Sequence, residues 1–260
     1  MSRLSRAAVV SAALLVFPAT LCLAGEDPMI SHPVKTVLLD FGNYYLAPSS
    51  LLRLGIGVAV DAVPANTNAD RWIRDKYQED VRSKGTDDVA KVAKVPGTAL
   101  VTIPVYVGAY GAGYLFRNAT ITDWSQRSAR ATLVGTPALL ILQGAIGSGR
   151  PEDGNSHWKP FHGSHGVSGH AYIGAVPFVT AAEMSGNPYR KGLFFALSTL
   201  TGLSRINDDA HYFSQAALGW YLAYLSCRAV SRGIAETAGQ TQFGVVPVAG
   251  GAAVTVHRVF

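Results

Sequence analysis

The stretch Ser204-Arg-Ile-Asn-Asp-Asp-Ala-His-Tyr-Phe-Ser-Gln215 leads into the last long apolar segment of the chain. Two other polar patches lie at the ends of apolar segments. Gln143-Gly-Ala-Ile-Gly-Ser-Gly-Arg-Pro151 closes one segment, and Val167-Ser-Gly-His170 opens the next. Arginine, histidine, serine and glycine recur among the three patches, and together these residue types indicate a site that binds an anion.

Each patch offers groups that suit phosphate. Arg150 and Arg205 carry planar guanidinium groups whose donors match phosphate oxygens. Ser168 and Gly169 lie where a helix is expected to begin, so free backbone N–H groups and the helix dipole favour an anion there. Gly169 also lets the backbone approach a ligand closely.

Two histidines supply the reactive chemistry. Phosphoryl transfer without a metal can use one imidazole as the nucleophile and another as the acid, and His170 and His211 are available for these roles. The sequence contains no His/Cys/Asp cluster with a recognisable metal spacing and no Gly-rich loop with a P-loop lysine. We therefore expect neither a metal nor an organic cofactor, and expect vanadate only as an inhibitor or phosphate mimic.

The three patches resemble the signature motifs of the type 2 phosphatidic acid phosphatase and vanadium haloperoxidase superfamily. Those motifs read Lys-x6-Arg-Pro, Pro-Ser-Gly-His and Ser-Arg-x5-His-x3-Asp. The spacing is kept, because six residues separate Gln143 from Arg150 and five separate Arg205 from His211. The resemblance covers residues 131–229.

The resemblance implies a role for each matched residue. His211 would attack phosphorus, and His170 would protonate the leaving oxygen and later activate water. The remaining matched residues would hold the phosphate oxygens as negative charge develops in the transition state. They are Gln143, Arg150, Ser168, Gly169 and Arg205.

Three positions depart from the family pattern. Val167 replaces a proline, which removes some backbone rigidity. Gln143 replaces the phosphate-binding lysine, so the site loses one positive charge. Gln215 replaces the aspartate that would orient His211. It shares a helix face with that histidine at i+4 and could accept from the ring N–H, but an amide cannot stabilise an imidazolium as a carboxylate does.

Neighbouring residues offer candidate replacements for the lost charges. Asp208 or Asp209 could supply the missing carboxylate, and Lys159 could replace the missing cation. The alternative is that this polar segment is solvated or shapes the mouth of the pocket. The same segment carries His157, His162 and His165.

Apolar segments predict an all-α helical bundle of the acid phosphatase and haloperoxidase type. The segments are Leu46–Val60, Thr98–Phe116, Ala131–Gly149, Ala171–Ala182 and Gly192–Ser204. Thr98–Phe116 and Ala131–Gly149 contain no charged residue, so each is long enough to span a bilayer as well as to form a buried helix. We favour a soluble or membrane-peripheral protein, with an integral membrane protein as the alternative.

One domain, residues 25–240, accounts for most of the chain. Gly25–Tyr45 is expected to be an extended lead-in, and Asn66 or Asn68 is expected to cap a helix through Lys84. Trp72, Ile73, Tyr77 and Val81 would form its apolar stripe, and another helix would start near Thr86. The tail, 241–260, contains two β-prone runs around Gly250-Gly251 and predicts a short β-hairpin.

The first 24 residues have the pattern of a secretory signal peptide. Arg3 and Arg6 precede an uncharged run from Ala7 to Ala24, which ends in small residues. Its removal would leave a net charge of about +3, because two of the 22 basic residues and none of the 17 acidic residues would be lost. This mild charge gives no indication of a nucleic-acid partner. We expect export to the periplasm or envelope of a bacterium and association with a membrane surface.

The favoured function is that of an exported phosphatase acting on phosphate monoesters, lipid phosphates or lipid diphosphates through a phosphohistidine. Two alternatives remain open at this point. One is an impaired family member that binds phosphorylated lipids without turnover, and the other is a vanadate-dependent haloperoxidase. The oligomeric state is not indicated by the sequence.

Overall fold

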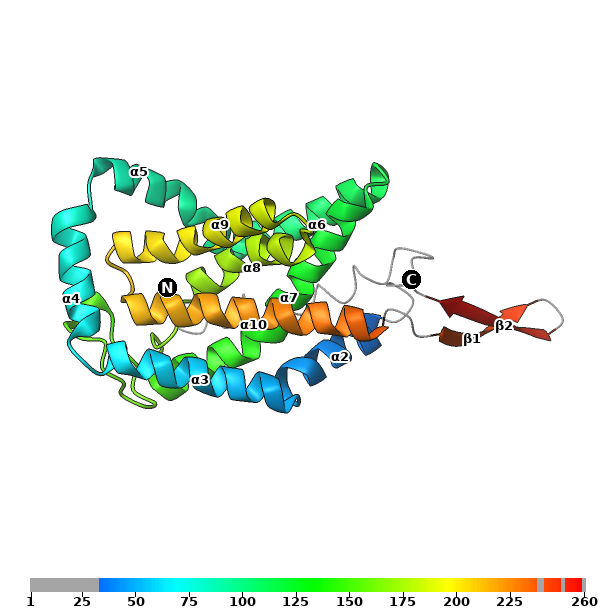
Figure 1. Cartoon of the computed structure of the whole chain (residues 1–260), viewed down its shortest axis with the longest axis horizontal. Helices are drawn as coiled ribbons and strands as arrows, with labels where there is room; N and C mark the ends of the chain where they lie inside the picture. The colour runs from blue at the N-terminus through cyan, green and yellow to red at the C-terminus, as the bar shows by residue number, and fades with distance from the viewer. Residues whose placement is uncertain (1–32, 238–240, 249–250, 259–260) are drawn as a thin grey trace.

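The computed structural model describes residues 33–237, 241–248 and 251–258, so the expected signal peptide lies outside the described residues. Its helices surround the long helix α10 (Phe213–Thr237), which lies at the centre of the bundle (Figure 1). In chain order the helical elements are α2 (Pro33–Tyr45), α3 (Pro48–Ala65), α4 (Ala69–Lys76), the π-helical turn η1 (Tyr77–Val81), α5 (Lys84–Ala93), the 3-10 turn η2 (Val95–Gly97), α6 (Ala99–Leu115), α7 (Ala119–Ile146), the 3-10 turn η3 (Pro151–Asp153), α8 (Gly169–Met184), α9 (Pro188–Asn207) and α10 (Phe213–Thr237). This arrangement confirms the all-α fold class.

The core lies between α10 and the helices around it, α8, α7, α3 and α2. Tyr172 and Val176 of α8 are fully buried against Leu222 and Ala223 of α10. Burying a large apolar side chain of this kind contributes about 1.5–3 kcal/mol. α8 is apolar around most of its circumference because it is enclosed by α7, α9 and α10.

The hydroxyl of Tyr45, the last residue of α2, bonds to backbone groups of α7 beside a proline that interrupts the hydrogen bonding of that helix. Pro137 has no backbone N–H and interrupts the hydrogen-bond ladder of that helix. The Tyr45 hydroxyl donates to the Val134 carbonyl at 2.8 Å and accepts from the Ala138 N–H at 3.0 Å. It therefore takes the place of one helical hydrogen bond and ties α2 to the helix that leads to Arg150.

A buried ion pair joins the same two helices at a second point, in the middle of each helix. The Arg130 guanidinium donates to both oxygens of Asp40 at 2.7 and 2.8 Å, and Asp40 is fully buried. Removing one partner from such a pair typically costs about 3–5 kcal/mol, because the other charge is left buried and unpaired. This pair therefore fixes where α2 lies on α7.

Two sequence-based expectations for the first third of the chain are wrong. The lead-in is helical from Pro33 to Tyr45, because Asp40 and Tyr44 of this segment are buried against the bundle. The predicted single helix through Lys84 is instead α4, the turn η1 and a break at Arg82, whose backbone is extended. α5 then starts at Lys84, where Ser83 and Thr86 form a capping box.

The proposed apolar stripe on that helix is also only partly buried. Trp72 is 64% exposed and Val81 is 50% exposed, so these two side chains do not line a core. The other predicted helices are confirmed, since α3, α6, α8 and α9 cover their apolar segments with shifts of a few residues at their ends. α7 also covers its segment, but it begins at Ala119, well before the predicted start at Ala131.

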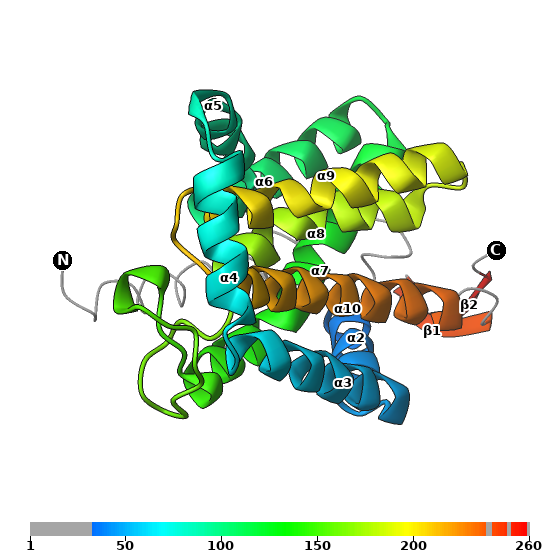
Figure 2. The ribbon, with the colours of Figure 1, turned by 60° about the vertical axis from the view of Figure 1, so that its left-hand side comes forward.

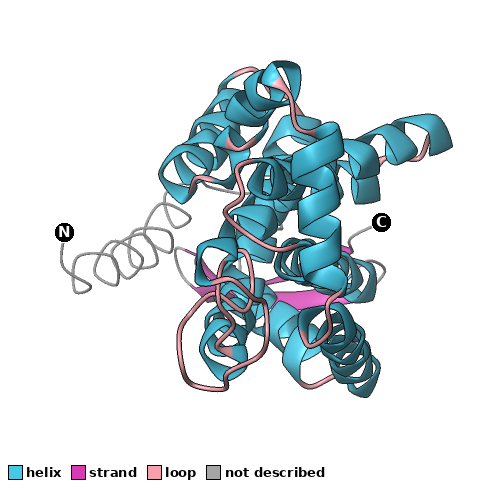
Figure 3. Ribbon diagram, turned by 90° about the vertical axis from the view of Figure 1, so that its left-hand side faces the viewer, coloured by secondary structure: helices cyan, strands magenta, loops and turns pink. Residues whose placement is uncertain are grey.

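α4 lies across the end of the bundle where α9 ends and α10 begins (Figure 2). Asp70 of α4 accepts from the backbone N–H and hydroxyl of Ser214 at the start of α10. Figure 3 faces this end of the molecule, where many of the connecting loops gather. The helix ends that carry the three polar patches are therefore all on one side of the bundle.

The C-terminal tail forms the predicted hairpin. β1 (Thr241–Val248) pairs antiparallel with β2 (Gly251–Arg258), with Thr241 opposite Arg258. The hairpin lies beyond the end of α10, away from the end of the bundle that α4 covers (Figure 1).

One described helical stretch, Ala119–Asp153, is long and apolar enough to cross a membrane, and 44% of its apolar window is buried inside the bundle. The bent pair Lys35–Tyr45 and Pro48–Ala65 passes the same test if it is counted as one span. Core helices of soluble proteins also meet this criterion, so it is weak evidence for a membrane span.

Candidate active site

The three polar patches meet at the end of the bundle. α7 and α9 end there, while α8 and α10 begin there. The chain leaves α7 through Gly147, which adopts the left-handed conformation (φ +58°) and lies so close to the Lys159 carbonyl that a Cβ would fall 2.1 Å from that oxygen. This turn directs the following residues, up to Arg150, toward the start of α10.

Gln215 holds the three patches together. Its side-chain oxygen accepts from the Tyr212 backbone N–H at 3.1 Å and lies 2.9 Å from Nδ1 of His211. Its side-chain nitrogen donates to the Ser148 hydroxyl at 3.0 Å and to the Gly149 carbonyl at 2.6 Å. The backbone carbonyl of Gln215 accepts from the N–H of Ser168 at 2.9 Å, which brings in the second patch.

These bonds fix the tautomer of His211. The amide of Gln215 must present its oxygen to the Tyr212 N–H and its nitrogen to the Gly149 carbonyl, so its orientation is determined by its partners. The oxygen beside His211 therefore accepts a proton on Nδ1, and Nε2 carries the free lone pair. An imidazole in this state is a nucleophile.

Burial keeps His211 neutral. The side chain is 7% exposed, and this desolvation, opposed only by the hydrogen bond to Gln215, lowers the pKa of His211 to about 3. This value also includes the positive charges of Arg150 and Arg205, which act in the same direction as burial. The imidazole is therefore uncharged at any pH near neutrality.

His170 is on the first turn of α8 and is half-buried. Burial lowers the pKa of His170 first, and the charges of Arg205, Arg150 and Lys94 lower it further, while Asp208 acts in the opposite direction. The three cations whose fields reach this ring show how positive the site is. A bound anion would offset them and favour the protonated ring.

Both arginines carry buried donors with no protein partner. The Nε atoms of Arg150 and Arg205 are buried and unpaired, and Arg205 otherwise contacts Asp208 at 3.2 Å. Burying an N–H donor without a hydrogen-bond partner costs folding free energy. Two such donors are therefore expected where a ligand completes the site. A phosphate group supplies the acceptors that they need.

Ser168 caps α8 as expected. Its hydroxyl oxygen accepts from the Ala171 N–H at 3.3 Å, and the side chain is fully buried. Gly169 follows as the first residue of the helix. The first backbone N–H groups of a helix have no partner within it, so this end of α8 offers donors to an anion.

Gln143 is not aimed at an anion. Its side-chain nitrogen donates to the Val167 carbonyl at 2.9 Å, immediately before Ser168. It therefore braces the second patch against the end of α7. The positive charge that the family's lysine would supply at this position is not replaced by this contact.

Neither aspartate compensates for Gln215. Asp209 accepts a two-point contact from Arg74 of α4, and Asp208 contacts Lys94 at 2.9 Å and Arg205. The partner of the His211 ring is Gln215 itself. The suggestion that one of these carboxylates orients His211 is therefore wrong.

A lysine that the sequence analysis did not select supplies the additional positive charge. Lys94 follows the last residue of α5, and its field lowers the pKa of His170. The adjoining turn packs directly on His170, because a Cβ on Gly97 would lie 2.7 Å from the His170 carbonyl. Lys159, the cation suggested from the sequence, is exposed on the loop after α7.

The loop histidines differ in their proximity to the site. His165 is partly buried, and its charge contributes to the lowered pKa of His211. His157 and His162 are exposed, and His162 is paired with the Pro160 carbonyl of its own loop. Within the described ranges, no three His, Cys, Asp or Glu side chains come together as a metal ligand set.

Residues 115–237 match the family model of the PAP2 superfamily, and this region contains all three patches. This match supports the type 2 phosphatidic acid phosphatase and haloperoxidase-like superfamily that the motif resemblance predicted. Members generally hydrolyse phosphate esters, which fits an anion site that contains two histidines. No curated protein and no solved structure gives a significant match.

The contacts of Gln215 lead to a prediction about its replacement by leucine. Gln215→Leu removes the acceptor for Nδ1 of His211 and the donor for Gly149, so kcat should fall by about 10²–10⁴-fold. The measurement is the rate of phosphate release from a chromogenic phosphate ester. Gln126→Leu is the matched control, since Gln126 is a buried glutamine of α7 that precedes its site end by five turns or more. Equal activity of Gln215→Leu and wild type would contradict the assignment.

The isosteric variant Gln215→Glu tests the same contact by pH. A carboxylate beside His211 stabilises its charged form and so raises the pKa of the imidazole from about 3. Since the nucleophile must be neutral, the acid limb of kcat/KM should move to higher pH in this variant. An unchanged acid limb would contradict a nucleophilic His211 held by Gln215.

Proposed function

We propose that this protein is an exported, metal-independent phosphatase that works through a phosphohistidine on His211. Its substrates are phosphate monoesters or lipid phosphates and diphosphates. The observation that carries the proposal is the state of His211, which is buried, neutral and oriented by Gln215 so that Nε2 bears the lone pair. The match to the PAP2 superfamily supports the same reaction class.

The reaction proceeds in two balanced steps. In the first, Nε2 of His211 bonds to phosphorus, the bond to the ester oxygen breaks, and the leaving oxygen takes a proton from His170. In the second, water attacks phosphorus and gives a proton to His170, the P–N bond breaks, and phosphate leaves. Both rings return to their starting states, so no other reactant is needed.

The charge of the substrate prepares His170 for the first step. Without substrate, burial and three cations hold the pKa of His170 below its ordinary value. A phosphate dianion bound between Arg150 and Arg205 neutralises part of that field and raises the pKa of the ring. Binding thereby promotes the protonation that the leaving group requires.

Fixed donors stabilise the charge of the transition state. The unpaired Nε groups of Arg150 and Arg205 and the free N–H groups at the start of α8 are the donors that would hold the phosphoryl oxygens. Because these donors have few protein partners to give up, little reorganisation accompanies the reaction. Vanadate, which mimics phosphate, should bind the same groups and inhibit.

We propose that Lys94 takes over the electrostatic role of the lysine that Gln143 replaces. It shares Asp208 with Arg205, and its charge reaches His170. Lys94 lies at the end of α5, which packs on α9, whereas the family's lysine would lie on α7. The charge of Lys94 therefore reaches the site from the side of α9.

The surface of the bundle supports work at a membrane surface on an apolar substrate. Several large apolar side chains are exposed on α3 and α6, including Leu52 (65%), Leu100 (72%) and Leu115 (77%). Each of these two helices exposes several such side chains along its length, and exposed apolar surface of this kind is typical of membrane or lipid contact. Export rests on the leader pattern in the sequence.

The test of the proposal is turnover by the purified chain in the presence of a metal chelator. Phosphate release from p-nitrophenyl phosphate and from a phosphatidic acid should persist, show competitive inhibition by vanadate, and disappear in His211→Asn. Binding of phosphatidic acid vesicles without turnover would replace this function with lipid binding. Halide oxidation by peroxide only after addition of vanadate would replace it with haloperoxidase activity.

Lys94→Met tests the proposed cation. Loss of a charge-assisted contact to a bound phosphate should lower kcat/KM by about 10–100-fold, with the affinity for vanadate reduced in parallel. Lys91→Met is the matched control, because Lys91 is on the same helix with a side chain that is 67% exposed and pairs with Asp88. A Lys94→Met enzyme with the kinetics of the Lys91→Met enzyme would contradict the role.

A further inference from the structure

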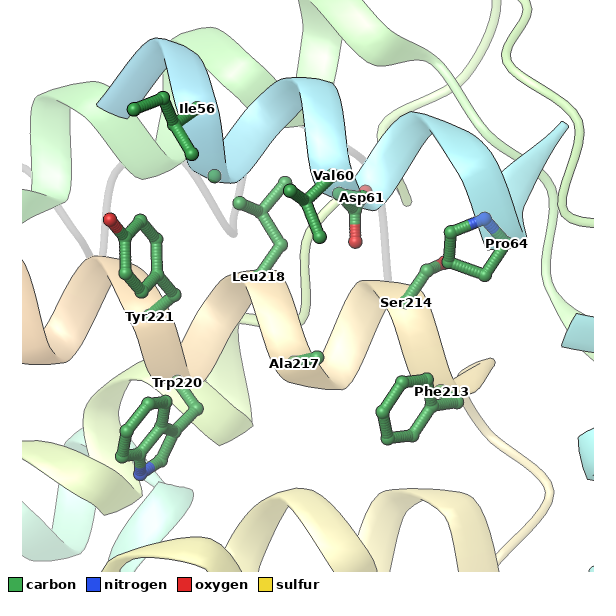
Figure 4. A pocket seen from close by; sticks show the side chains of 11 residues that line it. Ile56, Val60, Asp61, Pro64, Phe213, Ser214, Ala217, Leu218, Trp220 and Tyr221 are labelled. Carbon is green, nitrogen blue, oxygen red and sulfur yellow. The ribbon is translucent and has the colours of Figure 1, made fainter. Parts of the chain in front are cut away.

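An apolar groove runs between α3 and α10 (Figure 4). Its volume is about 330 Å³, within the range of small-molecule sites. The walls are almost entirely apolar and include three aromatic rings. The residues that line the groove include Val60, Asp61, Phe213, Ala217, Trp220 and Tyr221.

This groove is separate from the phosphate site. The residues of α10 that line it include Ser214, Ala217 and Tyr221, which share one face of the helix at about 100° per residue. Gln215 and Gly219 occupy the opposite face, where a Cβ on Gly219 would lie 2.4 Å from the Ser168 carbonyl. A ligand in the groove therefore lies across α10 from His211.

A buried carboxyl group faces this space without a partner. Asp61 of α3 is 6% exposed, and its Oδ2 atom has no hydrogen-bond partner. Figure 4 shows its side chain directed from α3 toward α10, with Val60 and Leu218 beside it. Asp70, the neighbouring acid from α4, is instead satisfied by the N–H and hydroxyl of Ser214.

The lining selects the chemistry of a ligand. An unpaired buried carboxyl is costly, and an ammonium group relieves that cost through charge-assisted hydrogen bonds. The rings of Phe213, Trp220 and Tyr221 attract a cation as well as apolar groups. An uncharged chain would leave the carboxyl without a partner, and an anion would be repelled by Asp61 and Asp70.

We propose that the groove between α3 and α10 binds an amphiphile with an alkylammonium group, the ammonium at Asp61 and the chain directed toward Trp220 and Tyr221. Figure 4 shows Asp61 and Ser214 toward one end of the groove and the two aromatic residues toward the other. The site is independent of phosphate hydrolysis, since it uses none of the residues that contact the phosphate.

Binding should depend on pH. Burial, together with the nearby charge of Asp70, raises the pKa of Asp61 to about 7. The phenol of Tyr221 on α10 stays neutral in this range, because burial raises its pKa. An ammonium pairs with the ionised carboxyl, so affinity should be full above pH 7 and should fall as the pH drops below it.

The test is calorimetric titration of the full chain with dodecylamine, dodecanol and sodium dodecyl sulfate, each below its micelle concentration. Dodecylamine should bind with one site per chain and at least about tenfold more tightly than dodecanol, by the strength of one charged contact. Asp61→Asn should remove this preference. A Tm within a few degrees of wild type reports that this variant is folded.

Ala217→Phe is the second variant, because it fills the groove and leaves Asp61 in place. It should abolish dodecylamine binding while Tm stays within a few degrees of wild type. Equal binding of amine and alcohol, binding that Asp61→Asn leaves unchanged, or no binding of the amine would each overturn the proposal. Loss of phosphatase activity in wild type would leave this result unaffected, so the two proposals fail separately.

Discussion

The site depends on the side-chain amide of Gln215. The amide oxygen accepts from the His211 ring and from the Tyr212 backbone N–H, and the amide nitrogen donates to Ser148 and Gly149. The backbone carbonyl of Gln215 accepts a further hydrogen bond from the N–H of Ser168. In this way the end of α7, the start of α8 and the start of α10 are held around His211. The rest of the bundle supplies rigid helices whose ends can meet at that amide.

This network changes the meaning of the departure from the family pattern. An aspartate at position 215 could accept from the His211 ring, but it could not donate to the Gly149 carbonyl, which lies 2.6 Å from the amide nitrogen. Glutamine gains that donor and gives up the stabilisation of an imidazolium. The low pKa of His211 fits the exchange, because a nucleophile that stays neutral needs orientation more than it needs a counter-charge.

The electrostatics of the site follow from the same arrangement. Arg150 and Arg205 keep buried donors unpaired, and Lys94 adds a third cation beside His170. A protein tolerates buried donors without hydrogen-bond partners where binding of a ligand, or catalysis, offsets their cost in stability. The two unpaired Nε groups, both beside the histidines, are therefore the donors that we expect an anion to complete.

Much of this could be predicted from the sequence. The three motifs lie within about 70 residues, their spacing is kept, and the apolar segments between them are long and uninterrupted enough to identify the helices. The contact between His211 and Gln215 was expected from their four-residue separation, although His211 precedes α10, which begins at Phe213, so the two residues do not share a helix face as predicted. Local pattern was sufficient for this contact, but it did not reveal the break at Arg82 or the capping box that follows it.

The other features that were missed depend on contacts between distant segments. Lys94 reaches Asp208 across more than 100 residues, and no local pattern distinguishes it from Lys159. The helix α2 contains Gly42 and Asn43 in its second half, and it is stabilised by the pair between Asp40 and Arg130, which sequence reading does not reveal. The groove acid Asp61 likewise looks like a surface residue until α10 is packed against it.

The most direct test of the central claim is to trap and locate the phosphorylated residue. Full-length protein is mixed with a radiolabelled phosphate ester, quenched in alkali or in acid, digested and mapped by mass spectrometry. A base-stable, acid-labile label on His211, present in wild type and absent in His211→Asn, is the result that the account predicts. A stable label on another residue, or phosphate release at the wild-type rate by His211→Asn, would contradict it.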